Sequence, residues 1–271
     1  MTYNDHMTKT VRVLSLGAGV QSSALCYMYQ LEKLKDFPDF AVFADTQAEP
    51  QEVYSFLKKL QKDITIFPIY TATKGDLRDH PNKIPFFVRH PNGKKGMGWR
   101  QCTNDFKVQV VIKKIRDILG YKPRQRWKHH IEMVMGISYD EIGRKKTPQE
   151  KWRTNAYPLI DKGLTRQDCI DFCKSYKLNP PRSACIMCPY RSKKEWAHMK
   201  KQHPKDFEAA CQYDEKIRLS ATRMGKGLSL EQYIRPELIP LRNIDLDHLT
   251  DNKQMDLQFG MANECEGMCG V

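Results

Sequence analysis

The sequence lacks any long hydrophobic run, and this absence limits where the protein can reside. No segment approaches the roughly 20 consecutive apolar residues that a membrane-spanning helix requires. Residues 1–10 are polar and lack the apolar centre of a secretion signal. We therefore expect a soluble, cytoplasmic protein with no membrane partner.

Acidic residues are scarce relative to basic ones. The 271 residues include 32 Asp and Glu against 45 Lys and Arg, which gives a net charge of +13. The basic residues form five clusters: Lys94-Lys95, Lys113 to Arg116, Lys122 to His130, Arg144 to Lys146 and Lys193-Lys194. This balance favours nucleic acid or small anionic substrates as partners. A basic surface without a specific partner is the alternative.

The alternation of apolar runs with helical periodicity predicts the fold class. Strands are expected at 11–16, 40–44, 64–70, 131–137 and 156–160, and helices at 22–35, 51–61, 104–119 and 165–176. Such alternation implies an α/β fold, a Rossmann-like parallel sheet with helices on both faces. Residues 71–99 are expected to form a long loop.

The alternation fades near residue 179, which suggests a division of the chain. We predict a nucleotide-binding α/β domain over residues 1–178. Residues 179–271 would hold a Cys-x-x-Cys segment, two helices and a tail, either as a separate part or within one integrated domain.

Familiar phosphate-binding motifs are missing from the one glycine-rich strand-to-helix segment. It has neither the Gly-Lys-Ser/Thr of a Walker loop nor the G-x-G-x-x-G spacing. Small residues there still let the backbone approach a phosphate, and the next helix offers free N–H groups. The candidate binding residues of this loop are Ser15, Gly17, Gly19, Gln21, Ser22 and Ser23. A purely structural turn is the alternative.

Polar residues near the ends of two other expected strands support the prediction that the glycine-rich loop binds a ligand. Asp45 and Thr46 follow the second strand, where Asp45 is placed to meet a ribose or a metal. Gly136 belongs to the segment that ends the fourth strand, and Arg144 lies shortly after it, placed to hold an oxyanion by bidentate donation. Parallel sheets bind ligands at the carboxyl ends of their strands, so these residues are expected to share one crevice. The alternatives are an Asx turn at Asp45 and a solvated charge at Arg144.

The nine cysteines are an odd number in a chain without a secretion signal, which favours metal binding, redox chemistry or catalysis over disulfides. Cys185 and Cys188 form a Cys-x-x-Cys pair that suits a metal or cluster. Cys102 precedes a helix whose dipole would stabilise a thiolate. Together these three predict an iron–sulfur site, with a zinc knuckle or a redox dithiol as alternatives. Core positions are expected for the cysteines on helices, Cys26, Cys169, Cys173 and Cys211.

Two further cysteines, Cys265 and Cys269, lie in the last seven residues. They suggest an arm that reaches a site, with a free tail as the alternative. Because Glu264 and Glu266 would raise the pKa of a neighbouring thiol, Cys265 would need a basic docking partner such as Arg144 to act as a nucleophile.

These segments resemble the phosphoadenosine-phosphosulfate (PAPS) reductase family, within the larger group of PP-loop adenine-nucleotide enzymes. S-L-G-A-G-V-Q-S-S-A-L is similar to the reductases' variant PP-loop, with Gln21 where ATP-cleaving members have aspartate. F-A-D-T-Q-A-E-P-Q-E-V-Y and G-I-S-Y-D-E-I-G-R resemble their second-strand and substrate-binding motifs. N-E-C-E-G-M-C resembles their C-terminal Glu-Cys-Gly motif, so that Cys265 matches the nucleophile.

The resemblance implies an enzyme that binds PAPS, APS or ATP. In the reductases the tail thiolate attacks the sulfonate sulfur, and a thioredoxin-like electron donor reduces the resulting Cys S-sulfonate. The cluster-bearing branch holds a [4Fe-4S] cluster on a Cys-Cys pair and a Cys-x-x-Cys. Here Gln101-Cys102 replaces the Cys-Cys pair, which leaves three matching ligands, with Cys269 of the tail as a further candidate.

Three hypotheses follow. The first is a sulfonucleotide reductase, supported by Gln21 and the Cys265 tail. The second is an ATP-dependent sulfurtransferase that thiolates tRNA or another nucleic acid, supported by the net charge and by a three-cysteine pattern typical of PP-loop tRNA-thiolating enzymes. It is weakened by the missing loop aspartate. The third is a non-catalytic, metal-stapled nucleotide-binding module.

Overall fold

A computed structural model describes residues 9–90, 92–220 and 231–246 of the chain. Its main sheet has five strands in the order β3-β2-β1-β6-β7, and every neighbouring pair is parallel. The strands of this sheet are β1 (Lys9–Leu16), β2 (Phe40–Asp45), β3 (Ile69–Thr73), β6 (His129–Met135) and β7 (Arg153–Ala156). The sequence prediction of an α/β fold with a parallel sheet is therefore confirmed.

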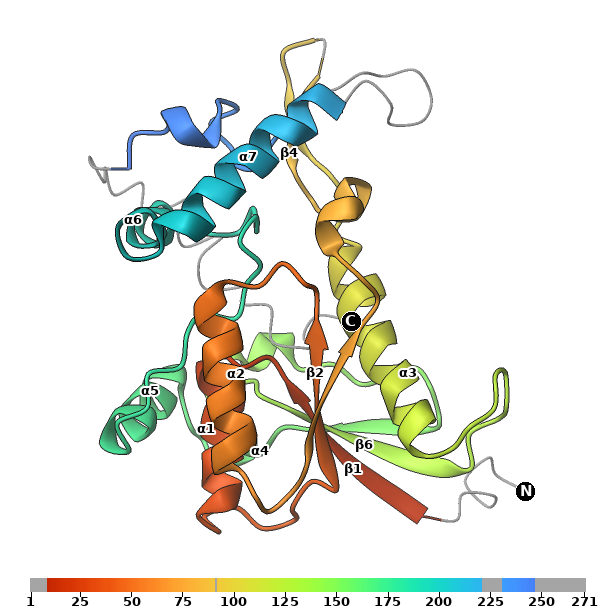
Figure 1. Cartoon of the computed structure of the whole chain (residues 1–271). Helices are drawn as coiled ribbons and strands as arrows, with labels where there is room; N and C mark the ends of the chain where they lie inside the picture. Colours follow the sequence, from red (N-terminus) through yellow and green to blue (C-terminus); the bar gives the residue numbers. More distant parts are fainter. Residues whose placement is uncertain (1–8, 91, 221–230, 247–271) are drawn as a thin grey trace.

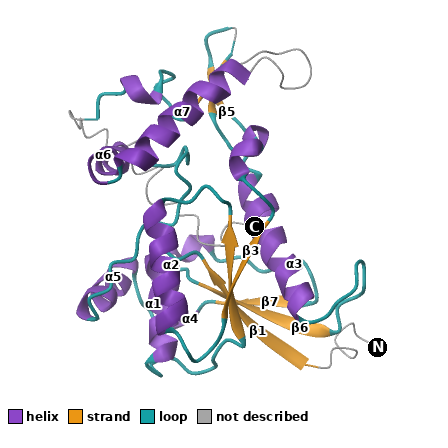
Figure 2. Ribbon diagram, viewed as in Figure 1, coloured by secondary structure: helices purple, strands orange, loops and turns teal. Residues whose placement is uncertain are grey.

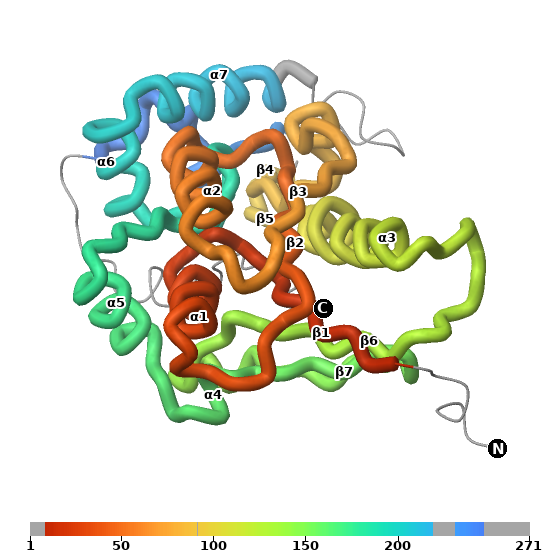
Figure 3. Tube along the Cα trace, turned by 60° about the horizontal axis from the view of Figure 1, so that its bottom comes forward, coloured from red at the N-terminus to blue at the C-terminus, as the bar shows by residue number. Residues whose placement is uncertain are grey.

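Helices cover both faces of this sheet, as Figure 2 shows. The helices are α1 (Val20–Gln30), α2 (Gln51–Asp63), α3 (Gln109–Ile118), α4 (Pro158–Asp161), α5 (Arg166–Ser175), α6 (Lys193–Gln202) and α7 (Pro204–Ser220). Alternate strand residues point to opposite faces. Leu14 and Phe43 thus lie in one core with α1, α2 and α5, while Val13 and Val42 lie in another with α3. Figure 3 shows α1 and α5 on the side away from α3.

Two predicted strands are wrong in position. The third strand was expected at 64–70, but β3 begins at Ile69, directly after Pro68. Proline has no N–H to donate to a ladder, and Pro68 enters the sheet only through its carbonyl, which accepts from the Ala41 N–H at 2.9 Å. The fifth strand was expected at 156–160, yet the strand ends at Ala156 and Pro158 opens the short helix α4, a position that suits proline.

The predicted loop at 71–99 holds short strands that its sequence did not reveal. They are β4 (Phe87–Arg89) and β5 (Lys95–Met97), which form a small antiparallel sheet with β8 (Gln232–Tyr233). Apart from the two cores on the faces of the main sheet, a separate core, called the second core below, joins this region to α6 and α7 around the fully buried Trp196 and Phe86. In Figure 1, α6, α7 and the small sheet lie above the end toward which β2 points. The predicted division at residue 178 stays a prediction.

Within the described residues, no helix is long and apolar enough to cross a membrane.

Candidate functional site

The loops after β1 and β6 meet at the point where the strand order reverses. In the order β3-β2-β1-β6-β7 the chain first builds outward from β1 and then returns to its other side, so β1 and β6 are the topological switch point. One carboxylate joins the two loops here. Glu141 Oε2 accepts from Gln21 Nε2 at 3.1 Å and from the Arg144 guanidinium at 2.8 Å. The side chains of Arg144 and Glu141 are only 16% and 9% exposed. Arg144 is therefore not a solvated charge, which was the alternative to oxyanion binding.

The glycine-rich loop is a buried, tightly folded turn. Gly17, Ala18 and Gly19 are all buried, and Ala18 has a φ of +56°, a left-handed conformation that costs a non-glycine residue energy. Helix α1 starts at Val20, without a side-chain cap and without an acidic residue in its first turn. Its first N–H groups and its positive dipole end are therefore available to an anion.

Three buried polar atoms at this loop have no hydrogen-bond partner among the described residues: Gln21 Oε1, Ser23 Oγ and Ser138 Oγ. Ser138 follows Gly136 at the end of β6, so the three atoms come from both sides of the switch point. A buried polar group without a partner costs about 1–3 kcal/mol, which calls for a ligand or ordered water nearby. Two hydroxyls and an amide beside a helix N-terminus suit the phosphates of a nucleotide.

The other predicted nucleotide residues are placed as follows. Ser15 is buried on β1, and the Ser22 Oγ donates to the Gly19 carbonyl at 3.5 Å. Asp45 forms the Asx turn that was the alternative to ligand binding, because its Oδ1 accepts from the Gln47 N–H at 2.8 Å. The same atom also accepts from the Tyr54 hydroxyl at 2.9 Å.

Thr46 at the end of β2 connects the nucleotide region to the cysteines. Its hydroxyl donates to Glu49 Oε1 at 3.0 Å and lies 3.3 Å from the sulfur of Cys185. The Ile186 N–H, in the turn of the Cys-x-x-Cys pair, donates to the Ala48 carbonyl at 2.8 Å. This turn is thus fixed to the carboxyl end of β2, the strand next to β1.

Cys102, Cys185 and Cys188 line one cavity of about 30 Å³, together with Lys107, Arg100 and Tyr190. Residues 102 and 103 are helical and lead into a π-helical turn, η4 (Asn104–Val108), that precedes α3. Such turns are frequent at functional sites. This one presents the buried Lys107 to the cavity. The structure therefore brings together the three cysteines that the sequence singled out from two distant segments.

Charged groups are buried around this cavity. Burial raises the pKa of the Cys185 thiol well above its ordinary value, and the nearby Glu49 carboxylate raises it further. Lys107 Nζ lies 3.7 Å from Glu49 Oε1 and opposes that shift. Burial also lowers the pKa of Arg191 to about 10, and this guanidinium donates to the carbonyls of Ala184 and Cys185. In this state Cys185 is the neutral thiol.

Thiols are ligands for both zinc and iron–sulfur clusters. Among the described residues, no group of three Cys, His, Asp or Glu side chains is placed to hold a metal ion. Three thiols on one cavity with cations beside them match what a cluster of thiolate ligands requires. In this conformation the cavity has room for only one or two water molecules.

The remaining cysteines divide into two groups. Cys26, Cys169 and Cys173 lie in the core on α1 and α5, and Cys211 lies in the second core, as predicted. Burial raises the pKa of Cys173 and of Cys211 to about 11 each, so both are inert thiols at neutral pH. Cys265 and Cys269 lie outside the described residues, and their roles stay predictions.

Sequence reasoning missed Glu49, Lys107, Glu141 and Ser138. Glu141 and Ser138 belong to the quoted G-I-S-Y-D-E-I-G-R motif and were available as polar residues after a strand. Lys107 offered a weaker signal, a lysine between Phe106 and Val108 where both neighbours are buried. Glu49 belongs to the quoted F-A-D-T-Q-A-E-P-Q-E-V-Y motif, but it becomes a partner of Lys107 only through the fold.

Comparison with known proteins does not identify the function of this chain. No family model matches the chain, and no curated protein matches its sequence. Solved structures do match, among them the U34-tRNA thiolase NcsA from Methanococcus maripaludis with its [4Fe-4S] cluster. This chain is 11% identical to that thiolase, and the match covers 78% of this chain and 73% of the thiolase chain, with a TM-score of 0.35. A similarity of this size carries no information about substrate or cofactor.

Proposed function

We propose that the chain is an enzyme that binds ATP at the β1/β6 switch point and transfers sulfur to a nucleic acid at the cavity of Cys102, Cys185 and Cys188. One observation carries this proposal. The three thiols line a single cavity, and the Cys185 turn is fixed to the end of β2, beside the strand that leads into the glycine-rich loop. A nucleotide and a sulfur site would thus share one edge of the sheet.

The number of thiols favours sulfur transfer. Cys102, Cys185 and Cys188 are the cysteines that line this cavity within the described part of the chain. Cys102, Cys185 and Cys188 would hold a [4Fe-4S] cluster, and a cluster held by these three thiolates alone would supply a binding position for exogenous sulfur. Lys107 and Arg100 would offset the negative charge of such a group.

Glu141 removes the main argument against ATP. The loop has Gln21 where ATP-cleaving PP-loop enzymes have aspartate, and the sequence alone offers no carboxylate there. In the folded chain the carboxylate of Glu141 contacts the Gln21 side chain, so an acidic group lies beside the loop. Carboxylates of this kind hold the magnesium that accompanies nucleotide phosphates.

The roles of the protein groups follow from their placement. The first N–H groups of α1 and the hydroxyls of Ser23 and Ser138 would donate to phosphate oxygens. Arg144 would stabilise charge on the phosphate that is attacked, because guanidinium pairs with phosphate in a bidentate manner. Burial of the loop excludes water and so strengthens each of these interactions.

Sulfonucleotide reduction is the second candidate, and Gln21 is the observation that favours it. Its side chain is fully buried and its Oε1 has no partner among the described residues, so the amide is free to meet a ligand at the position where reductases carry glutamine. The nucleophile of that reaction, Cys265, lies outside the described residues. The two candidates differ in the nucleotide that they bind.

The first prediction concerns the cluster. Purified without oxygen and reconstituted with iron and sulfide, the protein should contain about four irons per chain and show the broad visible absorbance of an iron–sulfur cluster. Cys102→Ala, Cys185→Ala and Cys188→Ala should each lose most of the iron, because each removes one ligand. Chemical iron and sulfide analysis and visible spectra provide the measurement.

Cys211→Ala is the matched control, since Cys211 lies in the same core at 1% exposure but does not line the cavity. It should keep the iron content of the unchanged protein. A colourless protein with one zinc per chain would contradict the cluster. Equal loss of iron in Cys211→Ala would show that the core, and not ligation, explains the effect.

The second prediction concerns the nucleotide. Titration calorimetry of the anaerobic protein should show binding of ATP in the presence of magnesium and none of a sulfonucleotide. The opposite result would favour reduction over sulfur transfer. Binding of neither nucleotide would refute the switch-point site in both candidates.

A further inference from the structure

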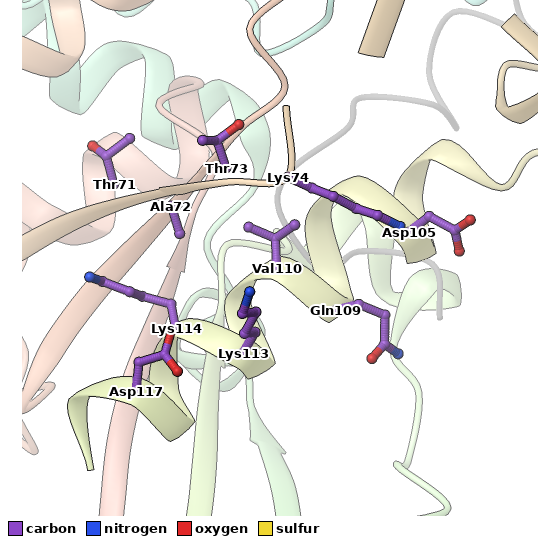
Figure 4. Close-up of a pocket in the computed structure, with 10 residues that line it drawn as sticks. All are labelled: Thr71, Ala72, Thr73, Lys74, Asp105, Gln109, Val110, Lys113, Lys114 and Asp117. Atoms are coloured by element: carbon purple, nitrogen blue, oxygen red, sulfur yellow. The ribbon is translucent and has the colours of Figure 1, made fainter. Parts of the chain in front are cut away.

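A second cavity, far larger than that of the cysteines, lies between the edge strand β3 and helix α3. Its volume is about 520 Å³. Figure 4 shows its walls, with Thr71 to Lys74 on one side and Asp105 to Asp117 on the other. From Asp105 to Asp117 the helical wall is about 18 Å long, at a rise of about 1.5 Å per residue. Neither wall contains a residue of the glycine-rich loop or one of the three cysteines that the proposed function uses.

Three lysines line this cavity from both walls: Lys74 after β3, and Lys113 and Lys114 on α3. None of the three forms a salt bridge with a described residue. Lys74 and Lys114 instead extend over the rings of Phe106 and Tyr70, with their ammonium groups 5.3 and 5.4 Å from the ring centres. These ring contacts hold two of the cations in place without neutralising them.

The acidic side chains on the wall do not cancel this charge. Asp105 is bound by Lys83 at 2.9 Å, and that lysine lowers the pKa of the Asp105 carboxyl below its ordinary value. Its charge is therefore balanced mainly by Lys83, which does not line the cavity, and to a smaller extent by Lys74. Asp117 lies one turn along α3 from Lys113 and Lys114 and forms no salt bridge with either of them.

Slightly more than half of the lining surface is polar, which is more than a typical site for a small organic ligand has. Sites of this volume for cofactors and drug-sized molecules are mostly apolar and aromatic. Among the described residues that line this cavity, the apolar side chains are Ala72 and Val110, and the hydroxyls of Thr71 and Thr73 add to the lysines. Such a surface suits the phosphates of a chain whose bases face elsewhere.

Basic residues continue beyond the end of α3. The segment that leads to β6 carries four exposed cations, Lys122, Arg124, Arg126 and Lys128. Its first cation, Lys122, lies four residues after helix α3 ends at Ile118, close in sequence to Asp117 of the cavity wall. Basic residues thus continue along the chain from the helical wall of the cavity into this segment.

We propose that the cavity between β3 and α3 binds the phosphodiester backbone of a nucleic acid, through Lys74, Lys113 and Lys114. This inference deepens the proposed function by assigning the surface that holds its acceptor. It predicts recognition without sequence preference at this surface, because the groups present are ammonium and hydroxyl donors. It also predicts that binding weakens as salt concentration rises.

The test compares two double variants that remove the same charge. In Lys74→Gln/Lys113→Gln, the affinity for a fluorescein-labelled single-stranded RNA should fall about tenfold near physiological salt, and the slope of log K against log salt should shrink by about 1.4. Lys58→Gln/Lys62→Gln is the control, on exposed positions of α2 across the sheet from α3. It should change the affinity far less. Fluorescence anisotropy measures both.

Each outcome decides the matter. Unchanged RNA affinity in Lys74→Gln/Lys113→Gln would overturn the proposal, and so would equal losses in both double variants, which would indicate a general basic surface. Loss of ATP binding with RNA binding retained would make the cavity a mononucleotide site and overturn it as well. Failure of the proposed function is distinguishable, because it would appear as missing cluster or ATP binding while the lysine variant still weakens RNA binding.

Discussion

At the scale of single residues, Glu141 changes the interpretation of the nucleotide loop most. From the sequence, Gln21 meant a loop without a carboxylate and so favoured a sulfonucleotide. The fold places the Glu141 carboxylate against Gln21 and Arg144, from a segment 120 residues later. The identity of one loop residue therefore did not determine the charge of the site.

The third prediction follows from this contact. Glu141→Gln keeps the shape of the side chain but removes its charge, so the affinity for ATP with magnesium should fall about tenfold, or about 1.4 kcal/mol. The affinity measured with magnesium chelated should change much less, because the carboxylate then has no metal to meet. Calorimetry under both conditions separates a role in metal-nucleotide binding from a purely structural one.

Asp171→Asn is the matched control for this experiment. It removes a carboxylate from an exposed pair with Lys174, whose members are 61% and 70% exposed and contribute little. Its ATP affinity should equal that of the unchanged protein. An equal loss with and without magnesium in Glu141→Gln would instead indicate that the loop has merely lost its support.

At the scale of elements, the sequence predicted helix boundaries correctly where local capping signals were strong. A helix was expected from residue 165, and α5 begins at Arg166, directly after a full capping box of Thr165 and Asp168. The Thr165 Oγ1 accepts from the Asp168 N–H at 3.2 Å, and Asp168 Oδ2 accepts from the Thr165 N–H at 2.8 Å. Prediction failed at Pro68 and Pro158, where apolar runs concealed the backbone limits of proline.

The fourth prediction is a stability change at this helix start. Thr165→Ala removes the cap of α5 and should lower the free energy of unfolding by about 1 kcal/mol. Because α5 lies on the core of α1, the loss should appear in the global unfolding transition. Denaturant titration followed by circular dichroism measures it. Thr147→Ala, at an exposed loop position, should cause no loss, and an equal loss there would argue against capping.

At the scale of the whole molecule, the second core decides where the cysteines lie. It joins Phe86 and Phe106 from the region before α3 to Trp196 and Tyr213 from the last helices. Burying side chains of this size stabilises the fold by about 1.5–3 kcal/mol each. The same packing brings Cys102 to the Cys-x-x-Cys turn across more than 80 residues of sequence. No pattern in either segment predicts this contact.

The sequence by itself determined the parallel α/β sheet, the glycine-rich loop at its centre and the cysteines with chemistry to offer. Those features depend on local periodicity, backbone restrictions and residue type, and all three can be read directly from the sequence. Only the tertiary structure decided that Glu141 meets Gln21, that Lys107 and Glu49 accompany Cys185, and that three lysines line a cavity at β3. These contacts join residues far apart in sequence, so they exist only once the sheet order and the second core have brought their elements together.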